Sequence, residues 1–236
     1  MSNGISVKKR NGRGIEPLDL EKIHKMVEEA TKGLAGVSAS QVEIQSGIQF
    51  YDGISTDEIQ EILIKSASDL IDLDHPNYQF VAARLLLFAL RKSLYGKMRE
   101  LPHLEPHIYD CVNRDVYDSG IYEKYSKEEI DKANSYIDHN RDFLFTYAGL
   151  RQVVDKYLVQ DRSSGGVYET PQFMYMMIAL TIFAEYPKET RLNYVRRYYD
   201  AISKHKLNIP TPIMAGVRTP LRQFASCVLV DIDDTL

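Results

Sequence analysis

The stretch ISVKKRNGRGI, residues 5–15, decides the fold expected for the N-terminal part of the chain. Two short segments, residues 5–9 and 14–15, flank Asn11-Gly12, a dipeptide typical of the turn in a two-stranded hairpin. Apolar residues then recur at helical spacing, and Gly33 and Gly36 mark an end, which predicts a helix over residues 20–34. Its apolar face consists of Leu20, Ile23, Val27, Ala30 and Leu34. The expected starting unit is a small hairpin that leads into an amphipathic helix.

Three further helices are expected before residue 97. Two of them begin at capping boxes, in which a serine and a glutamate three residues later accept hydrogen bonds from each other's backbone N–H groups. The boxes are Ser40 with Glu43 and Ser55 with Glu58, and a turn at Tyr51-Asp52-Gly53 separates them. The fourth helix is expected to begin at Pro76 and to stop near Gly96. The sequence thus predicts a short sheet that caps four helices.

The pattern stays mostly helical beyond a proline-containing linker at residues 100–106. Helix starts are expected at a third capping box, Ser126 with Glu129, at Thr170-Pro171, and near Glu189. Residues 157–168, with Gly165-Gly166 near their middle, predict a hairpin.

The last part of the chain combines prolines with a β-branched run that carries a cysteine. Ile209-Pro210-Thr211-Pro212 predicts an extended, rigid segment, because proline disfavours the helical conformation of the residue before it. Residues 224–230 predict a buried strand. The acidic residues that follow are typical of a first helical turn, but no helix follows them. We therefore expect this chain to be the N-terminal part of a larger protein, in which another segment pairs with this strand.

The composition limits the possible classes of protein. The chain has 236 residues, 44% of them hydrophobic, which predicts one or two globular domains. A net charge of −4 argues against a nonspecific nucleic-acid binder. The two cysteines form no disulfide framework, the N-terminus has no apolar signal segment, and the longest apolar stretch, residues 174–184, is too short to span a membrane. We expect a cytoplasmic protein with no membrane partner.

A basic cluster in the N-terminal part predicts an anion site. Lys8, Lys9 and Arg10 lie in the hairpin, and Lys22 lies in the first turn of the next helix, where a cation opposes the helix dipole. That cost makes sense if a phosphate binds between the hairpin and the helix start, with Lys92 contributing if the helices pack side by side. A solvated charged edge strand is the alternative, and charge alone favours it.

Cys227 is the second candidate functional residue. Free cysteines are usually buried core residues, and residue type alone favours that role. Thr211 and Ser226 are hydroxyl-bearing residues of the kind that orient a polar ligand. A thiol that reduces a substrate needs a second thiol for a disulfide, and Cys111, on a predicted helix, is a poor candidate. The six histidines show no metal-ligand spacing, so no metal site is expected.

Several motifs together resemble the large (alpha) subunit of class I ribonucleotide reductases. The N-terminal match, typical of an ATP-cone, consists of Val7-Lys8-Lys9-Arg10-Asn11-Gly12, Leu20-Glu21-Lys22-Ile23 and Tyr51-Asp52-Gly53-Ile54. The later match consists of Asp138-His139-Asn140-Arg141-Asp142, Lys156-Tyr157-Leu158-Val159, Glu169-Thr170-Pro171-Gln172-Phe173, PTPIMAGVRTP at 210–220 and RQFASC at 222–227. The resemblance covers essentially the whole chain, and the PTPIM…RTP.RQF.SC run is its most specific part.

The resemblance implies a mainly α fold in three parts. These are an ATP-cone (residues 1–96, a small β-hairpin sheet capping a four-helix bundle), a helical domain (97–220), and the start of an α/β catalytic barrel (221–236), of which only the first strand is present.

The resemblance also implies a function, the reduction of ribonucleoside diphosphates at the 2′ position by thiyl-radical chemistry with a redox cysteine pair. Cys227 would be the first cysteine of that pair, Thr211 and Ser226 substrate contacts, and Asp234 the start of a specificity effector site. Expected contacts to the allosteric effectors ATP and dATP are Lys9, Arg10, Glu16, Lys22, Thr56 and Lys92.

Partners follow from the same resemblance. They are the remaining catalytic half, a small radical-generating subunit that holds the metal-radical cofactor, and a thioredoxin- or glutaredoxin-type reductant, in a bacterial or phage-infected cell. The chain is then either an artificial truncation or one product of a split gene. A free-standing ATP-cone regulatory module and a purely structural helical protein are the alternatives; the run from Pro210 to Cys227 speaks against the first, and the basic cluster speaks against the second.

The ATP-cone match has departures. Asp19 stands where an asparagine is usual, Gln60 and Ala89 stand where related bacterial proteins have histidines, and one residue is inserted before Glu16. An acidic Asp19 would repel a triphosphate. Strong inhibition by dATP is therefore less expected than nucleotide binding itself.

Overall fold

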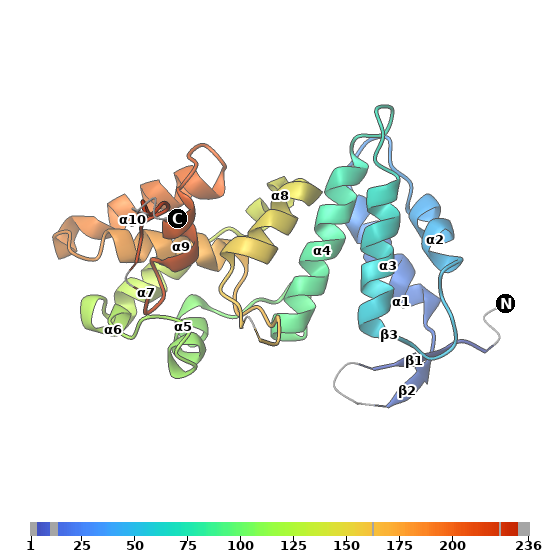
Figure 1. Ribbon diagram of the computed structural model, residues 1–236, viewed down its shortest axis with the longest axis horizontal. Helices are drawn as coiled ribbons and strands as arrows, with labels where there is room; N and C mark the ends of the chain where they lie inside the picture. The colour runs from blue at the N-terminus through green and yellow to red at the C-terminus, as the bar shows by residue number, and fades with distance from the viewer. Residues whose placement is uncertain (1–3, 10–13, 162, 222, 231–236) are drawn as a thin grey trace, which may run out of the picture. The chain divides into compact units, whose positions relative to one another are not determined.

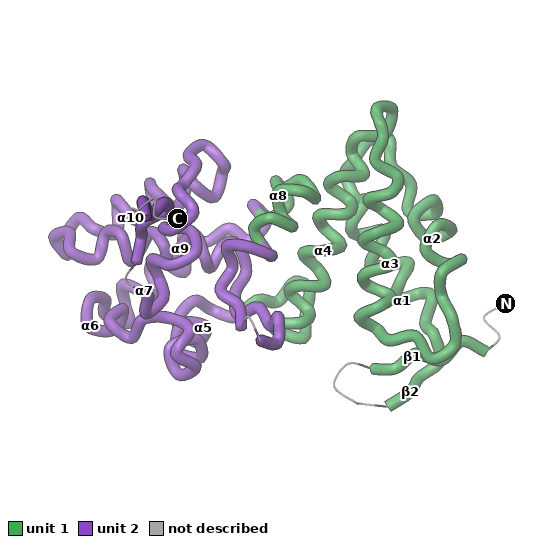
Figure 2. Tube along the Cα trace, in the orientation of Figure 1, with its two compact units in different colours: residues 1–101, 142–153 green, residues 102–141, 154–236 purple. Residues whose placement is uncertain are grey.

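The computed structural model describes residues 4–9, 14–161, 163–221 and 223–230. The chain divides into two compact units (Figure 2), the first comprising residues 1–101 and 142–153, the second residues 102–141 and 154–236. The expected boundary near residue 96 did not anticipate that residues 142–153 join the first unit. They do so because the Asp142 carboxylate pairs with the buried Arg91 guanidinium at 2.8 Å and Phe143 packs edge-on against Phe88.

The first unit contains the predicted hairpin, which is confirmed. Strand β1 (Ser6–Lys8) pairs antiparallel with β2 (Ile15–Pro17), with Val7 opposite Glu16. A third short strand, β3 (Ile54–Ser55), pairs parallel with β1 on its other side, giving the order β2-β1-β3. The predicted turn at residues 51–53 leads into β3, and its glycine adopts a positive φ of 82°.

The helices that follow are close to those predicted and pack beside the sheet (Figure 1). They are α1 (Leu20–Thr31), α2 (Ala39–Gly47), α3 (Thr56–Asp69) and α4 (Tyr78–Tyr95), with α8 (Tyr147–Gln152) packed on α4. The Ser55–Glu58 capping box is confirmed, and α4 ends at Gly96 in the left-handed conformation. The capping residue predicted for α2 was wrong: Ser38, whose backbone is extended, accepts from the Gln41 N–H, whereas Ser40 already lies inside the helix.

The second unit is helical throughout its regular parts. Its elements are α5 (Leu104–Asn113), α6 (Ile121–Lys124), α7 (Lys127–Asn134), the π-helical turn η3 (Val153–Tyr157), α9 (Pro171–Ile182), α10 (Lys188–Ser203) and α11 (Thr211–Gly216), while the 3₁₀ helix η2 (His139–Leu144) spans the division between the units. The Ser126–Glu129 capping box is confirmed. Residues 171–180 of α9 are all buried, so this helix, apolar on every side, forms the centre of the unit.

Two predictions for the second unit need correction, and a third holds in a shorter form. The segment expected to be extended contains α11, because a proline in the first turn of a helix costs no hydrogen bond and Pro212 occupies that turn. The hairpin expected at residues 157–168 is present but short: an antiparallel bridge joins Gln160 to Val167, and the backbone N–H groups of Asp161 and Tyr168 donate to the carbonyl oxygens of Gly166 and Val159. Residues 223–230 form no strand: they are exposed, and no described segment supplies the backbone partners that a strand needs. The first barrel strand is therefore absent from the described residues.

The fold class is otherwise mainly helical with one small sheet, as the sequence predicted.

Candidate functional site

A pocket in the first unit collects most of the residues predicted to bind an anion. Its cavity volume is about 150 Å³. The predicted residues that line it are Lys9, Glu16, Lys22, Thr56 and Lys92. Arg10, the sixth, lies outside the described residues. The pocket brings together side chains as far apart in the chain as Val7 and Lys92, and it lies where the sheet meets the helices.

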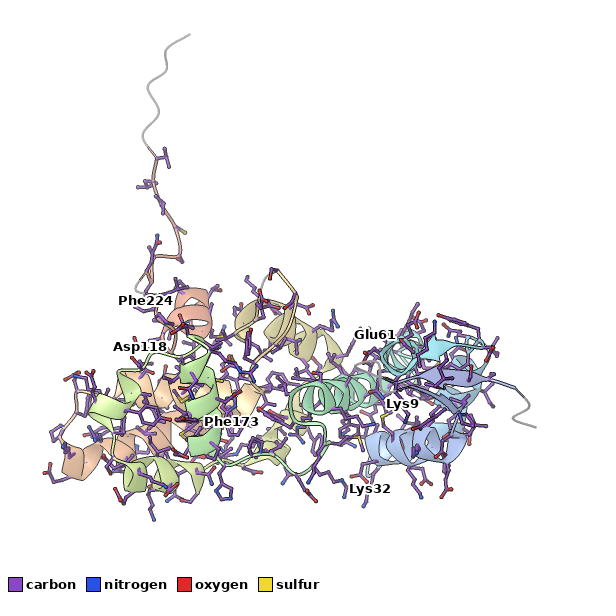
Figure 3. All side chains as sticks on the ribbon, turned by 90° about the horizontal axis from the view of Figure 1, so that it is seen from below. Lys9, Lys32, Glu61, Asp118, Phe173 and Phe224 are labelled. Carbon is purple, nitrogen blue, oxygen red and sulfur yellow. The ribbon has the colours of Figure 1, made fainter. Side chains whose placement is uncertain are left out.

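Four elements position these side chains. Lys9 follows β1, and its backbone N–H donates to the Gly14 carbonyl oxygen at 2.9 Å, which extends the hairpin; Figure 3 labels Lys9 within this unit. Lys22 lies in the first turn of α1, and Thr56 is the first residue of α3. Lys92 lies in the last turn of α4. The N-terminal turns of two helices therefore border the pocket, and backbone N–H groups there favour anions.

Two of the pocket lysines, Lys9 and Lys22, are paired with carboxylates that line the same pocket. Lys9 Nζ lies 2.7 Å from Glu16 Oε2, and Lys22 Nζ lies 3.1 Å from Asp19 Oδ2. The hydrogen bond from Lys22 lowers the pKa of the Asp19 carboxyl below its usual value, and the same bond raises the pKa of Lys22. Both pairs are partly or largely exposed to solvent, so each contributes little to stability.

The floor of the pocket is apolar, which the sequence analysis did not predict. Val7, Ile23, Met26 and Ile59 line it, and the Gln60 Nε2 donates to the Met26 sulfur at 3.3 Å. These positions follow the spacing of core residues, so the sequence alone gave no sign that one side of them faces a cavity. A charged rim over an apolar floor suits a ligand with phosphates at one end and an aromatic ring at the other.

The residues predicted for redox chemistry lie in the second unit. The Thr211 hydroxyl, at the start of α11, lies 3.3 Å from the Tyr157 hydroxyl. Ser226 Oγ lies 3.7 Å from the Sγ of Cys227, which is exposed; Figure 3 shows this segment running outward beyond Phe224. Within the described residues, no hydrogen bond joins Thr211 to Ser226 or Cys227. Asp234 lies outside the described residues.

Two kinds of feature are absent from the part of the chain that the structure describes. No group of three or more His, Cys, Asp or Glu side chains is arranged to hold a metal ion. None of the described helices has both the length and the apolar character that crossing a membrane requires.

Comparison with known proteins matches two family models to this chain. The ATP cone domain matches residues 5–93, which include every described residue of the pocket. The model named "Ribonucleotide reductase, all-alpha domain" matches residues 143–222.

Relatives match the whole chain but are much longer than it. The ribonucleoside-diphosphate reductase subunit alpha of Haemophilus influenzae and the ribonucleoside-diphosphate reductase 1 subunit alpha of Escherichia coli are each 50% identical over 236 residues, which is 100% of this chain and 31% of the relative. The alpha subunit of Enterobacteria phage T4 is 44% identical over 234 residues, 98% of this chain and 30% of that protein. The chain thus spans about a third of the length of these relatives. The chain carries matches to the ATP cone domain and to the ribonucleotide reductase all-alpha domain, and over its whole length it is similar to the N-terminal third of ribonucleoside-diphosphate reductase alpha subunits.

Proposed function

We propose that the pocket of the first unit binds ATP or dATP as an allosteric effector. The observation that carries this proposal is the placement of Lys9, Lys22 and Lys92 around one apolar-floored cavity. Ammonium groups form charge-assisted hydrogen bonds with phosphates, and the apolar floor offers room for a base. The match to the ATP cone domain over residues 5–93 supports the same ligand class.

Calorimetric titration of the full chain with ATP and with dATP tests this proposal. Lys22→Ala should weaken binding roughly ten-fold or more, because a hydrogen bond to a charged group contributes about 1.5–3 kcal/mol. Lys25→Ala is the matched control, since Lys25 lies on the same helix, is paired with Glu21 and does not line the pocket. Absence of heat with a folded wild-type chain would refute the proposal.

We further propose that the chain supplies the N-terminal part of a ribonucleoside-diphosphate reductase large subunit. The relatives bear that name, and the all-alpha match disfavours a free-standing regulatory module. In this function Cys227 is one thiol of a pair that is oxidised to a disulfide while the 2′ hydroxyl of the substrate leaves as water. Thr211 and Ser226 contact the substrate, and Asp234 belongs to a specificity effector site.

The second thiol of that pair comes from outside this sequence in our proposal. The sequence holds only two cysteines, and Cys111 is buried among α5 and its neighbours, so it does not serve as the partner of the exposed Cys227. The partners are therefore the complementary part of the large subunit, a small subunit that generates the radical on its own metal cofactor, and a dithiol reductant in the cytoplasm.

Reconstitution tests this second proposal. The chain alone should show no reductase activity, and mixing it with the complementary part and the small subunit should restore turnover. In the mixture, Cys227→Ser should abolish turnover with a dithiol reductant and leave ATP binding unchanged. Cys111→Ala, at a buried position outside the proposed chemistry, should retain activity. Turnover by the Cys227→Ser mixture would refute the role of Cys227.

A further inference from the structure

Two of the lysines in the candidate effector pocket are neutralised by carboxylates that line the same pocket. Lys9 and Lys22 each already have a carboxylate partner, and both partners, Glu16 and Asp19, line the same cavity. An anion that enters the pocket therefore meets no uncompensated charge on Lys9 or Lys22. It gains either ammonium group only when the existing pair opens.

The two carboxylates differ in how firmly they are held. Asp19 is the N-cap of α1: one oxygen, Oδ1, accepts from the backbone N–H groups of Glu21 at 3.1 Å and of Lys22 at 3.2 Å. The other oxygen, Oδ2, contacts Lys22 Nζ. Glu16 lies on β2, where its carboxylate is paired with Lys9 and its charge also acts on Lys22, but it caps no helix. Glu16 is therefore able to swing aside at little cost, whereas Asp19 is fixed by the helix cap.

We propose that Asp19 is an internal competitor that sets the nucleotide concentration at which the pocket fills. It holds Lys22, and a triphosphate must draw the Lys22 ammonium away from a carboxylate that stays in place. The consequence is a weaker effector site than its lysines alone would give. This inference rests on the proposed nucleotide site and adds how its affinity is set.

The charge states and the helix geometry support this role. The hydrogen bond with Lys22 lowers the pKa of Asp19, so the carboxylate is fully charged at neutral pH. Releasing it from α1 would leave two backbone N–H groups without their side-chain acceptor, and loss of an N-cap costs a helix about 1 kcal/mol. Lys22, about 70% exposed and flexible, is the member of the pair that moves.

The test is a double-mutant cycle on the full chain, read by calorimetric titration with ATP. Asp19→Asn removes the charge and keeps the cap, since asparagine is an equally good N-cap residue. We expect it to tighten ATP binding by about three- to five-fold, the upper part of the range for removing one exposed ion pair that competes with the ligand. In the Lys22→Ala background the same change should alter the dissociation constant by less than about two-fold.

Other outcomes would contradict the proposal. An equal gain in both backgrounds would mean that Asp19 repels the ligand directly and does not act through Lys22. An equal gain from the control Asp69→Asn, which opens a similar exposed lysine pair away from the pocket, would mean that net charge alone matters. ATP binding by the wild type without a gain in Asp19→Asn refutes this inference only, whereas folded variants that all fail to bind ATP refute the effector site as well.

Discussion

The Arg218 guanidinium and the Glu169 carboxylate form an ion pair in which both side chains are completely buried. Arg218 Nε donates to both carboxylate oxygens, at 2.9 and 3.0 Å, and its terminal nitrogens donate to the carbonyl oxygens of Met214 and Tyr157. The Tyr117 hydroxyl also donates to Glu169. This one buried pair therefore joins α11, η3 and the residue before the N-cap of α9 within the second unit.

Removing one member of this pair should destabilise the second unit strongly. Glu169→Ala leaves the Arg218 charge buried without compensation, which costs about 3–5 kcal/mol in comparable cases. Urea unfolding measures this loss. The control is Glu185→Ala, which opens the exposed pair with Lys124 and should cost less than about 1 kcal/mol. Similar losses in the two variants would contradict the assigned burial of the pair.

Local chemistry explains which elements the sequence could predict. The capping boxes at Ser55 and Ser126 were predicted correctly because their partners lie three residues away and need no tertiary contact. The strand expected at residues 224–230 was not found, because a strand depends on partners that the described residues do not provide. The placement of residues 142–153 depends on the pair between Asp142 and Arg91, 51 positions apart, which no local pattern announces.

In the candidate site, too, some features could be predicted from the sequence and others only from the structure. The resemblance named the polar residues of the pocket, and the structure brings Lys9, Lys22 and Lys92 to one cavity. The resemblance also named Asp19 as a departure, and the geometry shows that its carboxylate caps α1 and contacts Lys22 at once. These contacts reach only two and three residues along the chain, so an N-cap and a local ion pair are within reach of sequence patterns, but only the fold shows that both side chains line the cavity.

The two cysteines should differ sharply in reactivity towards a maleimide. Cys227 is exposed, whereas Cys111 is 1% exposed and burial raises its pKa to about 12, so Cys111 has almost no thiolate at neutral pH. Mass spectrometry of the native chain at pH 7.5 should show rapid modification of Cys227 alone. Both thiols should react in denaturant. Rapid modification of Cys111 in the native chain would show that the second unit opens around α5.

The segment that follows Phe224 should exchange its amide hydrogens at nearly the rate of an unfolded peptide. Val228, Leu229 and Val230 are 71%, 101% and 74% exposed, and no described strand pairs with them. Hydrogen exchange read by mass spectrometry measures this, with a peptide from α9 as the protected reference. Adding the proposed complementary part of the large subunit should slow exchange across residues 225–230. Strong protection in a monomeric free chain would show that the segment is paired internally.

The stability of the second unit should fall as the pH drops below 6.5, because of His107. Its ring is 4% exposed, lies stacked on Phe173 at 4.3 Å between centroids, and has Nε2 3.1 Å from the Tyr117 hydroxyl. Burial lowers the pKa of His107 from 6.5 to about 4, although the Glu169 and Asp110 charges oppose that shift. Between these two values the unfolded chain binds a proton that the folded chain does not bind, so folding loses free energy as the pH falls.

The size of this effect follows from the same two values. The loss begins near pH 6.5, reaches about 2 kcal/mol by pH 5 and is complete below about pH 4. Urea unfolding at pH 8, 6 and 5 measures it, and stopping at pH 5 stays above the range in which most carboxylates titrate. His107→Asn removes the titrating group, so the stability of this variant should depend less on pH over the same interval. If the stability of the wild type and the variant fell in parallel from pH 8 to pH 5, the His107 ring would not be buried in its neutral form, and the packing of α5 against α9 would have to be redrawn.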